Sequence, residues 1–197
     1  AFDHTVDILK KRLSELYRSA AAHQFVRDDG SKVKKFVNLD MESYRDLAIT
    51  TKAFIRSLDQ EEFKDHHAGM ALQAYLPDSY HILQEITHWA RKRVAAGGSL
   101  VKIRIVKGAN LEMEQLESAI FGWPLAPFDN KLEVDANWKR MVDFGMQPQN
   151  IQAVRLGIAS HFLSLVSITD VSDVIKALGD SIDFTFDIHI SAQISEK

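Results

Sequence analysis

Charged and amide side chains at the ends of predicted strands are the residues of this chain best suited to chemistry. In the predicted strand over 101–107, side chains alternate between two faces, so Lys102 and Arg104 share one face and Val101, Ile103 and Ile105 share the other. The strand leads into Lys107-Gly108-Ala109-Asn110, and a cationic front with a glycine-containing exit suits a site for an electron-rich, anionic ligand. Three further polar side chains stand near the carboxyl ends of other predicted strands: Asp40, Gln73 and His161.

An acid, an amide, a guanidinium and an imidazole around one mouth can bind a flat heterocycle with polar edges. Each of these side chains also has an ordinary structural interpretation. Arg104 could be the ion-pair partner of Asp40, and Asp40 could cap the helix that follows its strand. Gln73 could be a satisfied core amide, Lys107 could point to solvent, and His161 could be a packed histidine. The residues alone leave both interpretations open.

Strands and helices alternate along the chain and bring these side chains to one edge of a sheet. Apolar residues at steps of three and four predict helices, and strict alternation predicts strands. The first helix has an apolar stripe of Val6, Leu9, Leu13, Leu16 and Ala20. Turn residues predict a break at 28–31 and a loop over 121–130. The predicted helices cover 3–25, 42–58, 79–96, 111–120, 132–144 and 171–178, and the predicted strands cover 36–40, 70–76, 101–107, 153–161 and 182–190.

This repeated strand–helix unit predicts an α/β fold with a parallel sheet. A doubly wound sheet buries both faces of its strands and gives nearly continuous apolar runs. Several strands here instead set an apolar face against a polar one, as in a barrel whose polar faces line the interior. A complete (β/α)8 TIM-type barrel takes about 250 residues. The 197 residues of this chain therefore predict an incomplete barrel, or one with missing segments.

The composition is that of an ordinary globular domain, with 46% hydrophobic and 26% charged residues. The net charge of -3 gives no reason to expect nucleic-acid binding. The absence of cysteine excludes disulfides and thiolate metal sites. No apolar run approaches the roughly 20 residues of a membrane span, and the N-terminus lacks the pattern of a signal peptide. Because the chain starts with Ala1, we expect an excised piece of a longer protein.

The sequence contains no Gly-rich dinucleotide fingerprint, which argues against a Rossmann-type site. No structural metal site is predicted. His81 and His88 are seven residues apart on one helix, which separates them by about 10 Å and is too far to chelate one ion. Glu112, Glu114 and Glu117 are expected to form a solvated helix face.

Long motifs accompany the candidate residues. Asn38-Leu39-Asp40-Met41-Glu42 is followed by LQAYLPDS over 72–79 and IRIVKGANLE over 103–112. Gly122-Trp123-Pro124, KLEVDANWKRM over 131–141 and RLGIASH over 155–161 complete the series. Together they closely resemble the proline dehydrogenase family, most of all the proline dehydrogenase domain of bifunctional proline utilization A. The resemblance runs from Phe36 to His161, is looser before this range, and does not continue after it.

The resemblance implies a (β/α)8-type barrel that holds FAD and oxidises L-proline to Δ1-pyrroline-5-carboxylate. By the same resemblance, Arg104 lies beside the flavin N5, where a fixed guanidinium stabilises the negative charge of the reduced ring. Gln73 lies on the pyrimidine edge of the flavin. Asp40 matches an active-site carboxylate, and Met41 matches a position that packs near the substrate. The other matched cofactor positions are Val106, Lys107, Gly108, Ala109, Lys131, Ser160 and His161.

The chain departs from the family pattern at three points. Val134 stands where the family usually has Thr, and Phe162 stands where it has Asn. The family's arginine pair for the substrate carboxylate has no match, nor does an upstream strand with a flavin-contacting Lys. We therefore expect residues 1–197 to be part of one barrel domain, with an N-terminal helix and turn over 1–35, core units over 36–161 and a poorly matching tail over 162–197.

The resemblance also implies partners and a location. Electrons would pass to a quinone, an aldehyde dehydrogenase domain could follow in the native chain, and the protein would be cytoplasmic with peripheral contact to the inner membrane. Two alternatives remain. The chain could be another barrel enzyme that uses Arg104 and Lys107 to hold a phosphorylated metabolite, or an inactive fragment or packing module of a proline utilization A-type protein.

Overall fold

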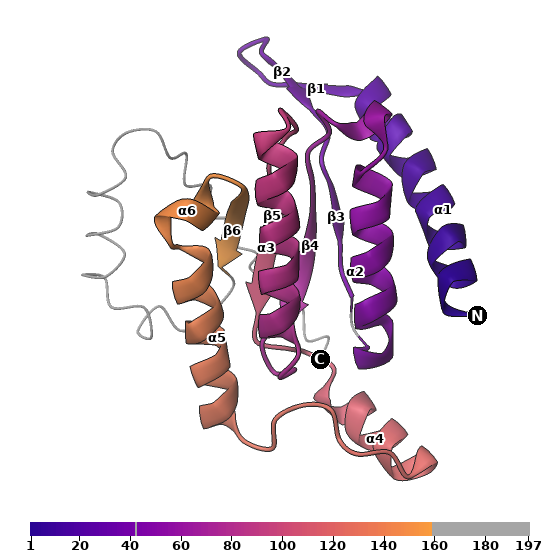
Figure 1. Ribbon diagram of the computed structural model, residues 1–197, viewed down its shortest axis with the longest axis vertical. Helices are drawn as coiled ribbons and strands as arrows, with labels where there is room; N and C mark the ends of the chain where they lie inside the picture. The colour runs from indigo at the N-terminus through magenta and orange to yellow at the C-terminus, as the bar shows by residue number, and fades with distance from the viewer. Residues whose placement is uncertain (42, 159–197) are drawn as a thin grey trace, which may run out of the picture.

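A computed structural model describes residues 1–41 and 43–158 of the chain (Figure 1). Within this range, four parallel strands form one sheet in the order β3-β4-β5-β6, and a separate antiparallel hairpin pairs β1 with β2. None of the described helices has both the length and the apolarity that a membrane crossing requires. The elements are α1 (Phe2–Ala22), β1 (Gln24–Val26), β2 (Lys32–Lys34), β3 (Val37–Leu39), α2 (Tyr44–Leu58), η1 (Glu61–Phe63), β4 (Ala68–Gln73), α3 (Ser79–Ala95), β5 (Val101–Val106), α4 (Leu111–Phe121), α5 (Lys131–Gly145), α6 (Pro148–Ile151) and β6 (Val154–Ile158).

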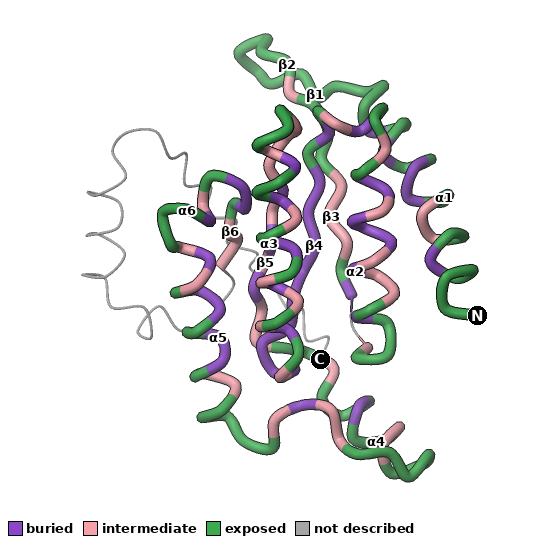
Figure 2. The backbone as a smooth tube through the Cα atoms, in the orientation of Figure 1, coloured by how far each residue is buried: buried purple, intermediate pink, exposed green. Residues whose placement is uncertain are grey.

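The two faces of β5 differ in the way that the alternation predicted, whereas β4 is buried at all six of its positions. On β5, Val101, Ile103 and Ile105 are fully buried, whereas Lys102 and Arg104 are only half-buried on the opposite face. Helices α2, α3 and α5 lie along one face of the sheet (Figure 1), and the buried residues gather between these helices and the strands (Figure 2). The apolar face of β5 therefore packs on the helices, and its cationic face is left on the inner side of a barrel-type sheet.

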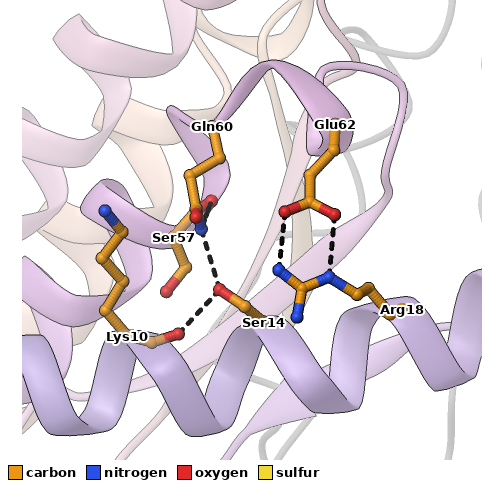
Figure 3. A network of polar contacts seen from close by, with 6 residues as sticks. All are labelled: Lys10, Ser14, Arg18, Ser57, Gln60 and Glu62. Atoms are coloured by element: carbon orange, nitrogen blue, oxygen red, sulfur yellow. Dashed lines mark hydrogen bonds and ion pairs between the residues drawn. The ribbon is translucent and has the colours of Figure 1, made fainter.

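Helix α1 packs along α2 through its own apolar stripe and a polar network (Figure 3). The Ser14 hydroxyl donates to the Lys10 carbonyl and accepts from Gln60 Nε2, both at 2.8 Å. Arg18 binds Glu62 through two hydrogen bonds of 2.8 and 2.7 Å. These contacts anchor α1 to the segment that links α2 to β4.

One position in the predicted apolar stripe of α1 was wrong. Leu16 is 54% exposed, and Tyr17 is buried in its place. Both residues fit a step of three or four after Leu13, so spacing alone does not choose between them. The choice follows from the neighbours, because the Tyr17 ring packs against Phe63 and His66 at centroid distances of 5.5 and 4.8 Å.

Arg93 hydrogen-bonds to the segments that lead into β4 and β5, at the amino-terminal edge of the sheet and away from the candidate site. Its guanidinium donates to the carbonyls of Phe63 and Lys64 at 2.6 and 2.8 Å, to the carbonyl of Leu58, and through Nε to Ser99 at 3.0 Å. Burial lowers the Arg93 pKa, and the charge of Asp59 opposes that shift. This buried side chain ties α3 to the segment before β4 and to the segment before β5.

Several predicted boundaries need correction. The first helix ends at Ala22 instead of 25, because Gln24–Val26 pairs with Lys32–Lys34 across the turn that contains Gly30. The strand predicted over 70–76 begins earlier and ends at Gln73, since the residues after it form a turn. The predicted helix over 171–178 and strand over 182–190 lie outside the described residues.

Candidate functional site at the carboxyl edge of the sheet

Strand register places Arg104 between two small residues on the inner face. Its neighbours across the sheet are Ala71 on β4 and Gly157 on β6. A Cβ on Gly157 would lie 3.6 Å from Arg104 Cγ and 3.3 Å from Lys102 Cε. The glycine therefore leaves room for the stems of both cationic side chains on the inner face.

Asp40 and Arg104, the two residues predicted to be catalytic, are brought together. Arg104 Nη2 donates to Asp40 Oδ1 at 2.6 Å, with side chains 35% and 59% exposed. Asp40 does not cap α2, whose N-cap residue is Ser43. Arg104 Nε is buried and has no hydrogen-bond partner in the described part of the chain. The ion pair thus occupies one side of the guanidinium and leaves a buried donor that an acceptor from a ligand could satisfy.

Gln73 is the last residue of β4 and is buried. Its Nε2 donates to the Met41 carbonyl at 2.7 Å, which ties the end of β4 to the residues after β3. The Met41 side chain is itself buried in the hydrophobic core. Gln73 and Met41 therefore lie next to each other at the carboxyl edge, with Asp40 between Met41 and the end of β3.

The predicted cofactor-lining segment forms the exit of β5. The carbonyls of Val106 and Lys107 accept from the backbone N–H groups of Ala74 and Tyr75, both at 2.7 Å. Gly108 has a φ of +133°, and a Cβ there would lie 2.5 Å from the buried Tyr75 ring. Gly108 and Ala109 are exposed. Only a glycine allows this close approach, so the exit is held in one shape while its backbone stays accessible.

Asp135 is a site residue that the sequence analysis missed. Its carboxylate accepts hydrogen bonds from both Lys107 at the exit of β5 and Lys131 in the first turn of α5. These hydrogen bonds, that from Lys107 first, hold the Asp135 pKa below its ordinary value. The i, i+4 spacing of Lys131 and Asp135 was a visible signal, but the link to Lys107 depends on how α5 docks.

Helix α4 follows the exit of β5 and lies beyond the carboxyl edge of the sheet (Figure 1). The prediction that its glutamates form a solvated face was wrong for Glu114, which is 9% exposed and accepts from the Tyr44 backbone N–H at 2.7 Å. The positive end of a helix favours such a carboxylate, and Tyr44 is the first residue of α2. Glu114 therefore anchors α4 to α2.

Two of the predicted cofactor residues, Ser160 and His161, lie outside the described residues. Lys131 is exposed at the start of α5. The described residues thus bring together Asp40, Met41, Gln73, Arg104, Lys107 and Gly108 along the carboxyl edge of one parallel sheet, and Asp135 links Lys131 to Lys107.

A four-stranded parallel sheet with helices along one face and a cluster of polar side chains at its carboxyl edge is that of an α/β protein, and it corresponds to part of a (β/α)8-type barrel. The proline dehydrogenase family model matches residues 3–188, which extends beyond the motif-bearing range on both sides. The chain belongs to the proline dehydrogenase family.

Solved structures agree with this assignment. Proline Utilization A (PutA) from Corynebacterium freiburgense is 47% identical with a TM-score of 0.72, over 81% of this chain and 16% of that one. PutA from Bdellovibrio bacteriovorus, inactivated by N-propargylglycine, is 34% identical with a TM-score of 0.68, over 82% and 15% of the two chains. PutA from Bradyrhizobium japonicum, at 20% identity, shows the fold alone. The comparison with curated proteins finds no match. The chain thus spans about one sixth of the length of the solved relatives.

Proposed function

We propose that this chain carries the site for FAD-dependent oxidation of L-proline to Δ1-pyrroline-5-carboxylate. Membership of the proline dehydrogenase family supports the reaction class. The observation that carries the proposal is Arg104, which stands on the inner face of β5, bound on one side to Asp40 and with a buried Nε that lacks a partner among the described residues. A buried unsatisfied donor costs about 1–3 kcal/mol, so a ligand acceptor at this point is favoured.

The residues at the carboxyl edge fit a flavin. Arg104 would hold the ring near its N5, and Gln73 would lie at the pyrimidine edge, close to the carbonyl of Met41. The exposed backbone at Gly108 and Ala109 can approach a ligand closely, since neither residue has a bulky side chain. The other positions proposed to contact FAD are Val106, Lys107, Lys131, Ser160 and His161.

Bound at this edge, FAD would supply the acceptor for the hydride that leaves the carbon next to the proline nitrogen. Arg104 supplies a fixed positive charge where negative charge accumulates. Asp40 holds that guanidinium in place before the reaction, so little reorganisation is needed as charge develops. Ala71 and Gly157 leave room beside Arg104. By its place in the family motif, Met41 would lie near the proposed substrate position, with its side chain packed in the hydrophobic core.

The proposal extends to the partners and the setting of the protein. The structures it resembles are proline utilization A proteins, one of them described as bifunctional. We propose that the electrons pass to a quinone, that an aldehyde dehydrogenase domain belongs to the native polypeptide, and that the protein is cytoplasmic with peripheral membrane contact. Residues 1–197 would form part of one barrel domain, of which 36–161 supply the core units.

The test is the pair of variants Arg104→Met and Arg155→Met. Arg155 is exposed on the neighbouring strand β6, in register with Lys102, and serves as the matched control. We expect Arg104→Met to weaken FAD binding at least tenfold and to slow flavin reduction by proline, because a hydrogen bond from a charged donor contributes about 1.5–3 kcal/mol. Arg155→Met should leave both unchanged.

Flavin absorbance and the rate of proline-dependent dye reduction are the two measurements. Inactivation by N-propargylglycine, which inactivates the Bdellovibrio bacteriovorus protein, is a third. Unchanged flavin affinity and unchanged reduction rate in Arg104→Met would contradict the proposal. A purified protein that takes up no flavin but binds a phosphorylated metabolite would favour the alternative barrel enzyme.

A further inference from the structure

Two ammonium groups share one carboxylate at the exit of β5. Asp135 is 15% exposed, and each of its oxygens accepts from a different lysine, Lys107 and Lys131. The two lysines come from different elements, so the carboxylate holds together two like charges that would otherwise repel each other. The cluster keeps one net positive charge.

The two lysines differ in their freedom to move. The Lys107 side chain is largely covered, and its Nζ lies 5.9 Å from the centre of the buried Trp138 ring. Lys131 is 74% exposed and is the first residue of the 15-residue helix α5. Asn130 caps this helix through its side-chain oxygen, which accepts from the Glu133 N–H at 2.9 Å. The positive end of α5 therefore adds to the charge of the lysines on the side where Lys131 is open to solvent.

We propose that Asp135 is a positioning residue that aligns Lys107 and Lys131 as a paired anion site for the diphosphate of the dinucleotide cofactor. The inference rests on the proposed function, since it concerns the same edge of the sheet and the same ligand. Asp135 itself does not touch the ligand. It sets the directions of the two ammonium groups, one fixed over Trp138 and the other at the solvent-open start of α5.

A diphosphate suits this arrangement because it presents two adjacent anionic groups to two adjacent ammonium groups. Lys107 also belongs to the β5 exit, whose neighbouring residues Gly108 and Ala109 expose their backbone. The cluster therefore borders the segment proposed to line the cofactor. A single phosphate would engage the pair less completely, and a flavin without phosphate would not engage it at all.

The test compares FAD, FMN and riboflavin binding to the wild type and to Asp135→Asn, by flavin fluorescence quenching. Asparagine keeps the size of the side chain and removes its charge, so the lysines separate. We expect FAD affinity to fall about tenfold, as for loss of one charge-assisted hydrogen bond, FMN affinity to fall less, and riboflavin affinity to stay unchanged. A simple charge effect has the opposite sign, because removal of a negative charge would strengthen binding of an anion.

Lys131→Met and Lys139→Met complete the experiment. Both lysines are exposed on α5, so neither substitution threatens folding. Lys131→Met should lower FAD affinity and reduce its dependence on salt, whereas Lys139→Met should change neither. The proposal is overturned if Asp135→Asn leaves FAD affinity unchanged or raises it, or if it weakens riboflavin as much as FAD. Should Asp135→Asn not fold, an unchanged FAD affinity in Lys131→Met overturns it. Failure of the proposed function looks different, because the wild type would then bind none of the three flavins.

Discussion

Gly108, at the exit of β5, is the residue of the candidate site at which a single methyl group should destabilise the fold most clearly. With a φ of +133°, Gly108 occupies a conformation that is strained for any residue with a side chain, at a cost of about 1–3 kcal/mol. A Cβ there would also lie 2.5 Å from two atoms of the Tyr75 ring, and Tyr75 is buried and cannot swing away. Overpacking of this kind costs a further 1–3 kcal/mol, roughly. Gly108→Ala should therefore lower the free energy of unfolding by about 4 kcal/mol.

Gly122 is a matched control. It has a φ of +67°, but nothing lies within 4 Å of a Cβ built there. Gly122→Ala should therefore show only the backbone strain, about 1–2 kcal/mol. Urea unfolding followed by tryptophan fluorescence measures both variants, and their midpoints should differ by about 1 M.

Tyr75→Ala identifies the source of the difference. In a double-mutant cycle, Gly108→Ala should cost less in the Tyr75→Ala background than in the wild type, because the ring that the new methyl group meets is gone. Equal midpoints for Gly108→Ala and Gly122→Ala, or a cycle without coupling, would refute the close approach of Gly108 to Tyr75. The fixed shape of the β5 exit would then lose its main physical support.

Two further predictions concern stability away from the inner face. Burial, ahead of nearby positive charge, lowers the pKa of His66 and of His67 below the ordinary value of 6.5, so the unfolded chain binds protons more readily than the folded one. The contribution of these histidines to the free energy of unfolding should be fully present above pH 6.5 and should be lost as the pH drops toward the lowered pKa values. Urea midpoints measured between pH 7.5 and 5 report this slope, and His66→Asn should flatten it. A slope that persists unchanged in that variant and in His67→Asn would contradict the assignment. Glu114→Gln should lower the free energy of unfolding by about 1 kcal/mol, because Glu114 accepts from the first backbone N–H of α2. Glu112 is an exposed neighbour on α4, and Glu112→Gln should leave the urea midpoint unchanged.

The inner face of the sheet could be predicted from the sequence because it depends on local alternation. Side chains two apart on a strand share a face, so Lys102 and Arg104 were correctly expected opposite Val101, Ile103 and Ile105. The carboxyl edge followed from the order of strands and helices, because parallel strands end together. The position of Gln73 at a strand end also came from the residues alone, whereas the family motifs added Met41, and the structure supplied the contact between the two.

What could not be predicted depends on docking between elements that are distant in the sequence. Asp135 binds Lys107 only because α5 packs beside β5. Glu114 binds the Tyr44 backbone only because α4 lies next to the start of α2. The sequence predicted only a turn at 28–31 and not the β1–β2 hairpin around it, because strands of three residues carry too little alternation to detect.

The ion pair between Arg104 and Asp40 unites the structural and the chemical interpretations of these residues. A partly exposed pair of this kind contributes about 0–1 kcal/mol to stability. The buried Nε that lacks a partner in the described part of the chain costs about 1–3 kcal/mol, which is as large or larger. Stability alone therefore does not account for an arginine at this position. In the proposed function, a ligand that accepts from Nε would reverse the balance, and Asp40, bound to the other side of the guanidinium, would fix the direction in which Arg104 meets it.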